Sequence, residues 1–414
     1  MKIKLLYIIL IVTCFSVFGQ VNSSYTRFGI GDIQYNYSAR RLGMSGVNIS
    51  IADPDFVSIN NPATIYRLNS TRFELSVKYG GERISNSTLN KFYSNTMFNG
   101  FTFGFPISSL DGIGAAFGIV RVSTVNYDVV DSTINTTNSS NDYYYSYSGN
   151  GGLSKIFISS SYHTPFNVNI GASFNYYFGN LNYSSTVNFP NNNIYNSVYR
   201  RTYSPRGLGT TVGLLSPDLA PLLNSSSITE FRIGASVDYI ATLSTDTILV
   251  GNSYYKVDTL GESTVKMKVP VRISTGVSFI LNNKYLFSVD YLYQPWSNFK
   301  FNNIKSDHLR NASKISAGFE YRPERGIGRS FWEQILLRAG LSYEKTQYLF
   351  NGIGINQFSV SGGFSIPVTY ENDIDIGLEY AVRGSKNNGL YKENIYKLNL
   401  SFALGDLWFI RTER

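Results

Sequence analysis

Residues 166–178 read FNVNIGASFNYYF, with apolar residues at the even positions and mostly polar residues at the odd positions. An alternation with a period of two predicts a β-strand with one apolar and one polar face. The same pattern returns at 285–293, 315–322, 337–344, 374–383 and 396–404. A sheet of such strands needs apolar surroundings on one face and polar surroundings on the other.

Two β architectures alternate in this way: a soluble sandwich with its polar face in water, and a membrane barrel with a polar lumen. The alternating runs reach roughly 9 to 13 residues, the length of membrane-crossing strands and more than the usual 5 or 6. Charged residues such as Glu320, Arg338 and Glu379 fall on the face rich in glycine and serine. The sequence therefore predicts an all-β fold, a transmembrane antiparallel β-barrel.

Runs of this kind give about fourteen candidate strands, and bacterial single-chain barrels have even numbers. The candidate ranges are 72–80, 98–107, 112–127, 151–163, 166–180, 198–214, 229–241, 263–281, 285–296, 312–322, 334–346, 357–367, 373–384 and 395–404. Short links at 164–165 and 282–284 are expected to be periplasmic turns. Longer polar links at 131–142, 189–197 and 243–263 are expected to be outside loops.

Composition favours strands and excludes one class of partner. The chain has 32 Tyr, 28 Phe and 36 Gly against 3 Trp and 4 Met, and 15% of its residues are charged. Aromatic, glycine-rich composition favours sheet over helix. A net charge of +8 with no basic run longer than Arg200-Arg201 does not indicate nucleic acid binding.

The N-terminus predicts export. Lys2 and Lys4 precede an uncharged apolar run from 5 to 18, and polar residues follow Gly19. The run is about 14 residues, shorter than the ~20 of a spanning helix, so 1–19 is predicted to be a cleaved signal peptide. Cys14, the single cysteine, follows Thr13 rather than a small residue, which makes a lipoprotein signal the weaker alternative. A cleaved chain would hold no disulfide.

Residues 20–70 do not alternate, and they contain two short helix-like pieces at 39–44 and 61–66. A segment with no place in the wall is expected inside or beneath it, which divides the chain into a signal peptide (1–19), a hatch (20–70) and a barrel (71–414). Pro62 fixes its own φ and biases Asn61 away from helical values, so Asn61 is a natural cap for a helix that starts at Pro62. The alternative is an ordinary helix start without a special role.

The segment resembles the FadL/TodX (OMPP1) family of outer-membrane transporters. The resemblance is carried by ARRLGMSG at 39–46, Ala52-Asp53, and Asn61-Pro62-Ala63 followed by Leu68. Thr64-Ile65 stand where the family usually has Gly-Leu. The strand at 337–340 is also similar, and the tail at 408–411 resembles tails of barrel proteins from the Bacteroidetes.

The resemblance implies a fourteen-stranded barrel with an N-terminal hatch in the lumen. It implies an outer-membrane channel, gated by the hatch, for uptake of hydrophobic small molecules such as long-chain fatty acids. The expected partners are outer-membrane lipid, the hydrophobic ligand and, during biogenesis, the barrel-assembly machinery, with the protein a monomer. The alternative is a barrel without transport, a structural or shuttle partner of the type IX secretion apparatus. A general porin would need an open lumen. The expected hatch would fill the lumen, which argues against a general porin.

Catalytic chemistry is not indicated. His163 and His308 are the two histidines, too far apart in the chain to suggest a metal site or a catalytic pair. The run Ser306-Asp307-His308 is better explained as a solvated loop than as a triad. No enzyme activity, no catalytic residue, no metal and no cofactor are predicted.

Charged residues of the lumen have two possible roles. Arg40, Arg41 and Arg338 could bind a ligand carboxylate. The competing interpretation is that they form salt bridges with lumen carboxylates and so fasten the hatch. The carboxylates considered are Asp290, Glu320, Asp375 and Glu379.

Overall fold

The computed structural model describes residues 23–87, 90–108, 111–135, 143–190, 195–252, 256–324, 329–369 and 371–406. The predicted signal peptide at 1–19, with Cys14, and the tail at 408–411 lie outside these residues. No helix in the described ranges has the length and hydropathy needed to cross a bilayer.

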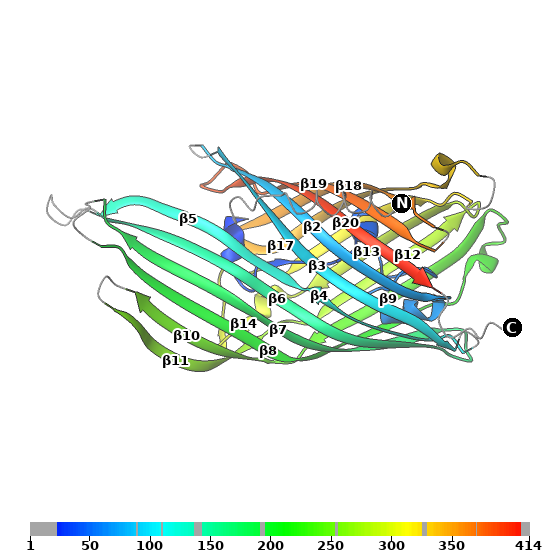
Figure 1. The fold of residues 1–414 in the computed structure, drawn as a ribbon, viewed down its shortest axis with the longest axis horizontal. Coiled ribbons are helices and arrows are strands. Elements are labelled where there is room, and N and C mark those ends of the chain that lie inside the picture. Colours follow the sequence, from blue (N-terminus) through cyan, green and yellow to red (C-terminus); the bar gives the residue numbers. More distant parts are fainter. Residues whose placement is uncertain are drawn as a thin grey trace, which may run out of the picture.

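A closed antiparallel barrel of 14 strands forms the wall (Figure 1). Some crossings are interrupted by a short break, so that two labelled strands follow each other along the same crossing. In chain order the crossings are β2 (Thr71–Ser85), β3 (Asn90–Ser108), β4 (Ile113–Arg121) with β5 (Ser123–Asn135), β6 (Tyr143–His163), β7 (Asn169–Asn188), β8 (Ser197–Leu215), β9 (Ile228–Ile240) with β10 (Leu243–Asn252), β11 (Val257–Lys268) with β12 (Arg272–Leu281), β13 (Tyr285–Gln294), β16 (Ala312–Tyr321), β17 (Leu336–Phe350), β18 (Ile353–Pro367), β19 (Asp373–Arg383) and β20 (Lys392–Asp406).

The first and last crossings close the barrel. Strand β2 pairs with β20 without interruption, from Thr71↔Asp406 to Ser85↔Lys392. Each of the fourteen predicted ranges overlaps one of these crossings. The predicted fold class, a fourteen-stranded antiparallel barrel with an N-terminal hatch, is confirmed.

Strand β7 shows why these residues form a membrane barrel and not a sandwich. Its apolar Ile170 and Phe174 are 40% and 59% exposed, whereas its polar Asn169, Ser173 and Asn175 are at most 4% exposed. A soluble sheet would bury the apolar face. Here the polar face is buried inside and the apolar face is left outside, as lipid requires. Similar exposed apolar side chains surround the wall at Phe117, Ile158, Val212, Ile233, Val277, Val289, Leu341, Val360, Leu378 and Phe402; we call them the lipid belt.

The two ends of the barrel differ. One carries the connections at 109–112, 164–168 and 282–284, and the other carries those at 136–142, 189–196 and 295–311. We call them the turn end and the loop end. The convention for outer-membrane barrels places the turn end in the periplasm. The loop-end connection 295–311 holds η4 (Trp296–Asn298) and the hairpin of β14 (Lys300–Phe301) and β15 (Ile304–Lys305), and the turn end holds η3 (Ala220–Leu223) and η5 (Phe331–Gln334).

At the loop end, one side of the wall extends far beyond the rest (Figure 1, left). Strands β6 and β7 have 21 and 20 residues, about twice the ~9–11 that a crossing needs. With β5, β8, β10 and β11 they form a projecting sheet, which we call the wing. Gly151, with φ 123°, lies where the wing meets the barrel, and a Cβ there would lie 2.0 Å from the Asn180 carbonyl oxygen.

The wing corrects one prediction. The range 243–263, expected to be an outside loop, forms β10 and most of β11, which pair in register from Leu243↔Met267 to Asn252↔Val257. Its outward positions include Ser244, Asp246 and Glu262 rather than a run of large apolar residues. Because the wing stands outside the lipid belt, neither face has to be apolar, and a test for apolar alternation misses it.

Candidate functional site

The hatch lies inside the barrel and runs from the loop end to the turn end (Figure 1, dark blue). Its first part contains η1 (Ser24–Arg27) and β1 (Asp32–Ile33), and its second part contains α2 (Ala39–Leu42) and η2 (Pro62–Arg67). We call residues 23–34 the strap and residues 38–67 the plug. The strap reaches the loop end, where Tyr25 Oη donates to the Tyr391 carbonyl at 2.9 Å. The plug reaches the turn end, where Arg67 pairs with Glu230 at 2.9 Å.

Asn61, Pro62 and Ala63 fasten the plug to the wall. The Asn61 side-chain oxygen accepts from Ala63 N at 3.0 Å, which caps η2 as its sequence predicts. The amide nitrogen donates to the Ile49 carbonyl at 2.6 Å and to the Leu214 carbonyl on β8 at 3.1 Å. The side chain is fully buried. One asparagine therefore joins a helix start, a second plug segment and the barrel wall.

Asn61→Asp is expected to destabilise the protein more than Asn61→Ala. Alanine loses the cap, worth about 1 kcal/mol, and leaves two carbonyls without their donor, for a total of about 2–3 kcal/mol. Aspartate keeps the cap but turns an oxygen toward both carbonyls. Urea unfolding in detergent, followed by tryptophan fluorescence, measures both. Asn180→Asp is the matched control, because that exposed amide accepts from Ser204 Oγ and an aspartate would still accept. Equal stability of Asn61→Asp and the native protein would contradict the role of the two donated bonds.

Glycines on the inner face of the wall bring the plug backbone against it. A Cβ on Gly340 would lie 2.5 Å from the Met44 carbonyl carbon and 2.7 Å from Ser45 N. A Cβ on Gly377 would lie 2.4 Å from the Ala39 carbonyl oxygen. These glycines and others at which a Cβ would meet the plug form what we call the glycine girdle: Gly114, Gly171, Gly213, Gly234, Gly318, Gly340 and Gly377, of which Gly213 meets the side chains of Asn61 and Pro62 and the others meet plug backbone atoms. Plug and wall thus pack as closely as two parts of one core.

A buried ion-pair network holds the same boundary. Its arginines are Arg40, Arg41, Arg322 and Arg338, and its carboxylates are Asp53, Asp55, Glu320 and Asp375. Arg322 bridges the plug and the wall, with Asp53 and Glu320 each at 2.6 Å. Arg40 pairs with Asp55 at 2.9 Å, and Arg41 pairs with Asp53. The four positive and four negative side chains balance, so no member of this network is left as a free cation for a ligand.

Asp53 lies at the centre of this network, in the plug. Burial alone would raise the pKa of its carboxyl, but Arg41, Arg322 and Arg40 together outweigh burial and hold the pKa well below its usual range. The pKa of Asp55 is lowered in the same way, with Arg40 outweighing burial. Both carboxylates therefore stay charged, and the network stays intact, at neutral and mildly acidic pH.

The structure brings together five of the seven charged residues singled out in the sequence: Arg40, Arg41, Arg338, Glu320 and Asp375. Arg338 contacts Glu320 at 2.5 Å and Asp375 at 3.0 Å. The other two lie apart from them. Asp290 accepts from Asn48 N at 2.6 Å and Ile49 N at 3.0 Å, and Glu379 pairs with Lys397 at 2.7 Å. Sequence reasoning missed Asp55 and Arg322, and it quoted Asp53 without a role.

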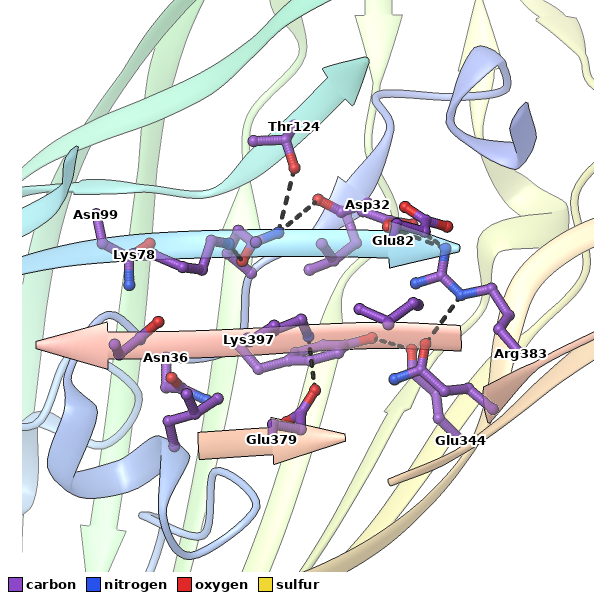
Figure 2. A pocket seen from close by; sticks show the side chains of 18 of the residues that line it. Asp32, Asn36, Lys78, Glu82, Asn99, Thr124, Glu344, Glu379, Arg383 and Lys397 are labelled. Carbon is purple, nitrogen blue, oxygen red and sulfur yellow. Dashed lines mark hydrogen bonds and ion pairs between the residues drawn. The ribbon is translucent and has the colours of Figure 1, made fainter. Parts of the chain in front are cut away.

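A polar cavity of about 90 Å³ separates the strap from β2, β19 and β20 (Figure 2). Figure 2 shows Lys397 directed at Glu379, and charges of both signs around the space. Arg383 holds the strap by pairing with Asp32 at 3.0 Å. Lys78 donates to Gln34 of the strap at 2.6 Å. Such a lining suits water and does not suit a hydrophobic ligand.

An aromatic pocket of about 490 Å³ lies on the other side of the strap, against the wing. Its volume is in the range of small-molecule sites. The wing contributes most of the aromatic lining and β14 contributes Phe301, whose ring meets Tyr203 edge-on at 5.0 Å. The main aromatic residues are Phe28, Tyr127, Tyr147, Tyr183, Tyr199, Tyr203, Phe299 and Phe301. The sequence did not point to this pocket, because its aromatic residues come from six separate segments.

Arg27 of the strap also lines the aromatic pocket. Its guanidinium lies over the Phe28 and Phe350 rings, 4.7 and 5.3 Å from their centres. Burial lowers the pKa of this side chain. Its Nε has no hydrogen-bond partner among the described residues, and no carboxylate there pairs with it. Arg27 is a desolvated cation beside an apolar pocket.

The wall has a gap beside the strap. Strand β3 pairs with β4 from Gly100↔Val120 onward, but its loop-end part, 90–98, pairs with β2 alone within the described residues. On the far side of the gap, β5 pairs with β6 and with β1 of the strap, at Asp32↔Thr124 and Ile33↔Ser123. The strap therefore covers the root of an opening between β3 and β5.

Histidines and acidic residues do not form a metal site in the described part of the chain, where no group of three or more potential ligands gathers. His163 bonds to Asn169 at 2.8 Å, and His308 stacks on Phe28, 4.4 Å between ring centres. The two histidines lie at opposite ends of the barrel.

Comparison with known proteins gives one family and one fold. A family model described as BamG matches residues 1–413. No curated protein sequence matches the chain. Solved structures with a similar fold include the CymD monoaromatic hydrocarbon channel, 15% identical over 89% of this chain and 97% of that one, with a TM-score of 0.59. The Ralstonia pickettii toluene transporter TbuX is 14% identical over 89% and 98%, with a TM-score of 0.58. A Pseudomonas aeruginosa FadL homologue is 12% identical over 89% and 98%, with a TM-score of 0.59. At these identities the likeness is one of fold, and it agrees with the FadL/TodX resemblance of the sequence.

Proposed function

The chain belongs to the BamG family, and from this premise we propose an outer-membrane barrel that binds hydrophobic small molecules at its loop end and passes them beside the strap while the plug stays fixed. The loop end faces the outside of the cell. Long-chain fatty acids and aromatic hydrocarbons are the ligand classes to test, the second because two proteins of similar fold are described as a monoaromatic hydrocarbon channel and a toluene transporter.

The observation that carries the proposal is the aromatic pocket. It is apolar, large enough for a small molecule and reachable from the loop end, whereas the lumen below it is occupied by the plug and by charged residues. Apolar ligands gain about 25 cal/mol for each Å² that they remove from water, and aromatic walls supply that area with little loss of side-chain freedom.

Arg27 replaces the cations chosen from the sequence. Arg40, Arg41 and Arg338 each pair with a buried carboxylate, so their charge is already neutralised within the network. Arg27 has no carboxylate partner in the described chain and borders the pocket. A fatty-acid carboxylate beside Arg27 would form a charge-assisted pair in a partly desolvated place, where such pairs are strong.

The route past the strap follows from how differently the two parts of the hatch are held. The plug meets the glycine girdle and the ion-pair network, and moving it would break both. The strap is held instead by the short β1–β5 pairing, by hydrogen bonds and by the Arg383–Asp32 ion pair; the hydrogen bonds include Ser23 Oγ to Glu393 at 2.7 Å and Thr26 Oγ1 to the Asn126 carbonyl at 3.1 Å. It separates the aromatic pocket from the gap between β3 and β5. Displacing the strap would open a sideways path from the aromatic pocket into the membrane. In this proposal the moving part of the hatch is the strap, residues 23–34, and not the whole segment 20–70.

Ligand binding by the purified protein in detergent tests the proposal. Phe301→Ala is expected to weaken binding of a long-chain fatty acid and of toluene by about tenfold, because it removes one aromatic wall. Arg27→Gln should weaken fatty-acid binding by a similar factor and leave toluene binding unchanged. Phe92→Ala, at a 53% exposed ring outside the pocket, is the control. Calorimetry or fluorescence displacement measures all three. Native protein that binds neither ligand, or variants that all bind as the native protein does, would rule the pocket out.

A second candidate is a structural role without transport, and the fastening of the plug favours it. A barrel whose lumen is closed by a balanced ion-pair network and close backbone packing is suited to act as a rigid membrane partner. The family name makes the barrel-assembly machinery the first such assembly to test, and type IX secretion, considered from the sequence, is the second.

Extraction in mild detergent separates the two roles. A structural partner should copurify with a large complex whether or not Phe301 is present, and should bind no ligand in the assay above. A transporter should bind ligand and elute as a single barrel.

The same proposal includes cleavage of residues 1–19, a monomeric state and the lack of catalysis. The mass of the extracted protein tests the cleavage, and its size tests the monomeric state.

A further inference from the structure

Four lysines gather at the base of the wing: Lys266, Lys268, Lys300 and Lys305. Lys268 is the direct cross-strand partner of Lys300, and Lys300 is the direct partner of Lys305. Directly opposed residues of antiparallel strands point to the same face. Lys266 lies two positions from Lys268 and shares that face. We call the four residues the lysine row, since they run across β11, β14 and β15.

The lysine row points away from the lumen. Met267 and Phe301, which alternate with these lysines along β11 and β14, line the aromatic pocket on the inner face. Lys266, Lys268 and Lys305 are exposed, and Lys300 is half-buried. Asn302 and Asn303, with φ of 49° and 62°, form the two-residue turn that fixes the register of the β14–β15 hairpin.

These lysines lack counter-charges. No acidic side chain of the described residues forms an ion pair with any of the four. Two other basic residues of the wing are paired: Arg206 with Asp246 at 2.6 Å and Lys256 with Asp258 at 2.7 Å. Like charges directly opposite each other destabilise a sheet. Two successive Lys–Lys pairs across three strands therefore call for an anion from outside the chain.

The lysine row stands just beyond the lipid belt. Along the same crossing, β12 begins at Arg272, and Ile273 is 48% exposed on the lipid-facing side. Ile273 is five positions beyond Lys268, roughly 16 Å along a strand at ~3.3 Å per residue and less in height, because barrel strands tilt by ~40°. Lysine side chains extend toward the interface from such positions. A lysine row at this distance from the lipid belt is within reach of lipid headgroups.

We propose that the lysine row binds phosphate groups of a phosphorylated glycolipid in the outer leaflet of the membrane. Neighbouring strands are ~4.8 Å apart, so the row presents ammonium groups over a span of about 10 Å. That span matches an extended, multiply charged headgroup surface better than a single small anion. A lipid is favoured over free phosphate for a second reason: the row faces sideways, next to the belt, where headgroups are concentrated by the membrane itself. The inference is independent of ligand uptake.

Thermal unfolding in detergent tests this proposal with three probes: lipid A, the same lipid without its phosphates, and inorganic phosphate at equal concentration. Lipid A is expected to raise the Tm of the native protein by about 3 °C, as a ligand that binds only the folded state does. The variant Lys268→Gln/Lys300→Gln/Lys305→Gln should lose that shift. Without lipid its Tm should equal or exceed that of the native protein, because it removes like-charge repulsion, so a folding defect is not expected to obscure the result.

The matched control is Lys91→Gln/Lys345→Gln/Lys386→Gln, which removes the same charge from exposed lysines that do not form a row. It should keep the full lipid A shift. The proposal is overturned if the row variant and the control respond equally to lipid A, or if the dephosphorylated lipid acts as strongly as lipid A. It is also overturned if inorganic phosphate alone reproduces the shift, which would make the row a site for free anions.

Discussion

Replacement of Arg338 by methionine is expected to lower the free energy of unfolding by about 3–5 kcal/mol, the cost of removing one partner from a buried ion pair. The Arg338 side chain is completely buried and contacts Glu320 at 2.5 Å, Asp375 at 3.0 Å and Ser365 Oγ at 2.6 Å. Methionine fills much of its volume but leaves the balanced network with one more carboxylate than arginines. The excess negative charge lies where water cannot reach it.

Urea unfolding in detergent or lipid vesicles measures that loss, and Arg206→Met is the matched control. Arg206 also pairs with a carboxylate, Asp246 at 2.6 Å, but both side chains are about half exposed, so its loss should cost less than about 1 kcal/mol. Because Arg338 joins the wall to the network that holds the plug, its replacement should also raise ion conductance in a planar bilayer. Equal stability of the two variants would show that the network does not fasten the plug.

Gly340→Ala is expected to cost roughly 2–3 kcal/mol, the upper range for overpacking a tight core. The added Cβ would lie 2.5 Å from the Met44 carbonyl carbon, 2.7 Å from Ser45 N and 2.9 Å from Met44 Cα. These are backbone atoms, so no side chain can turn aside to make room. Either β17 or the plug has to shift, and the hydrogen bond from Ser45 N to Ser361 Oγ, now 2.8 Å, would lengthen.

Gly261→Ala is the control for that prediction. Gly261 lies on β11 of the wing, where an added Cβ would meet nothing within 4 Å. Alanine there should be neutral or slightly stabilising, since it reduces the freedom of the unfolded chain. Comparing the urea midpoints of the two variants removes the general effect of a Gly→Ala change. A Gly340→Ala midpoint as high as that of Gly261→Ala would mean that the plug is not pressed against the wall.

The wall could be predicted from the sequence because lipid imposes one rule on every crossing. Ile376, Leu378 and Tyr380 have to be apolar wherever they point at lipid, and the alternation is visible in a single sequence. The rule ends at the edge of the membrane. Strands β10 and β11 have water on their outer face, so Ser244, Asp246 and Glu262 satisfy them, and the pattern that identified the other crossings is absent.

The interior could be predicted in part. Asn61 as a helix cap follows from the chemistry of the Asn-Pro pair alone. The choice between ligand binding and salt bridges for Arg40, Arg41 and Arg338 could not be made, because it depends on where Asp53, Asp55 and Arg322 lie, and these positions are set by the folded hatch. On β8 the sequence does reflect the aromatic pocket. Tyr199, Arg201 and Tyr203 occupy inward positions there, whereas the inward positions from 207 to 213 are glycine or threonine.

The pairing of β2 with β20 around an already filled lumen has a consequence for how the molecule forms. The plug touches the wall through glycines spread around its circumference, and a closed ring of that size leaves no passage through which it could enter afterwards. The pairing of β2 with β20 must therefore form last, after residues 38–67 have bound to the inner face of the curved sheet. The plug thus acts as a template around which the barrel strands assemble. A variant that weakens the contacts between plug and wall should slow closure of the barrel and also destabilise the closed barrel.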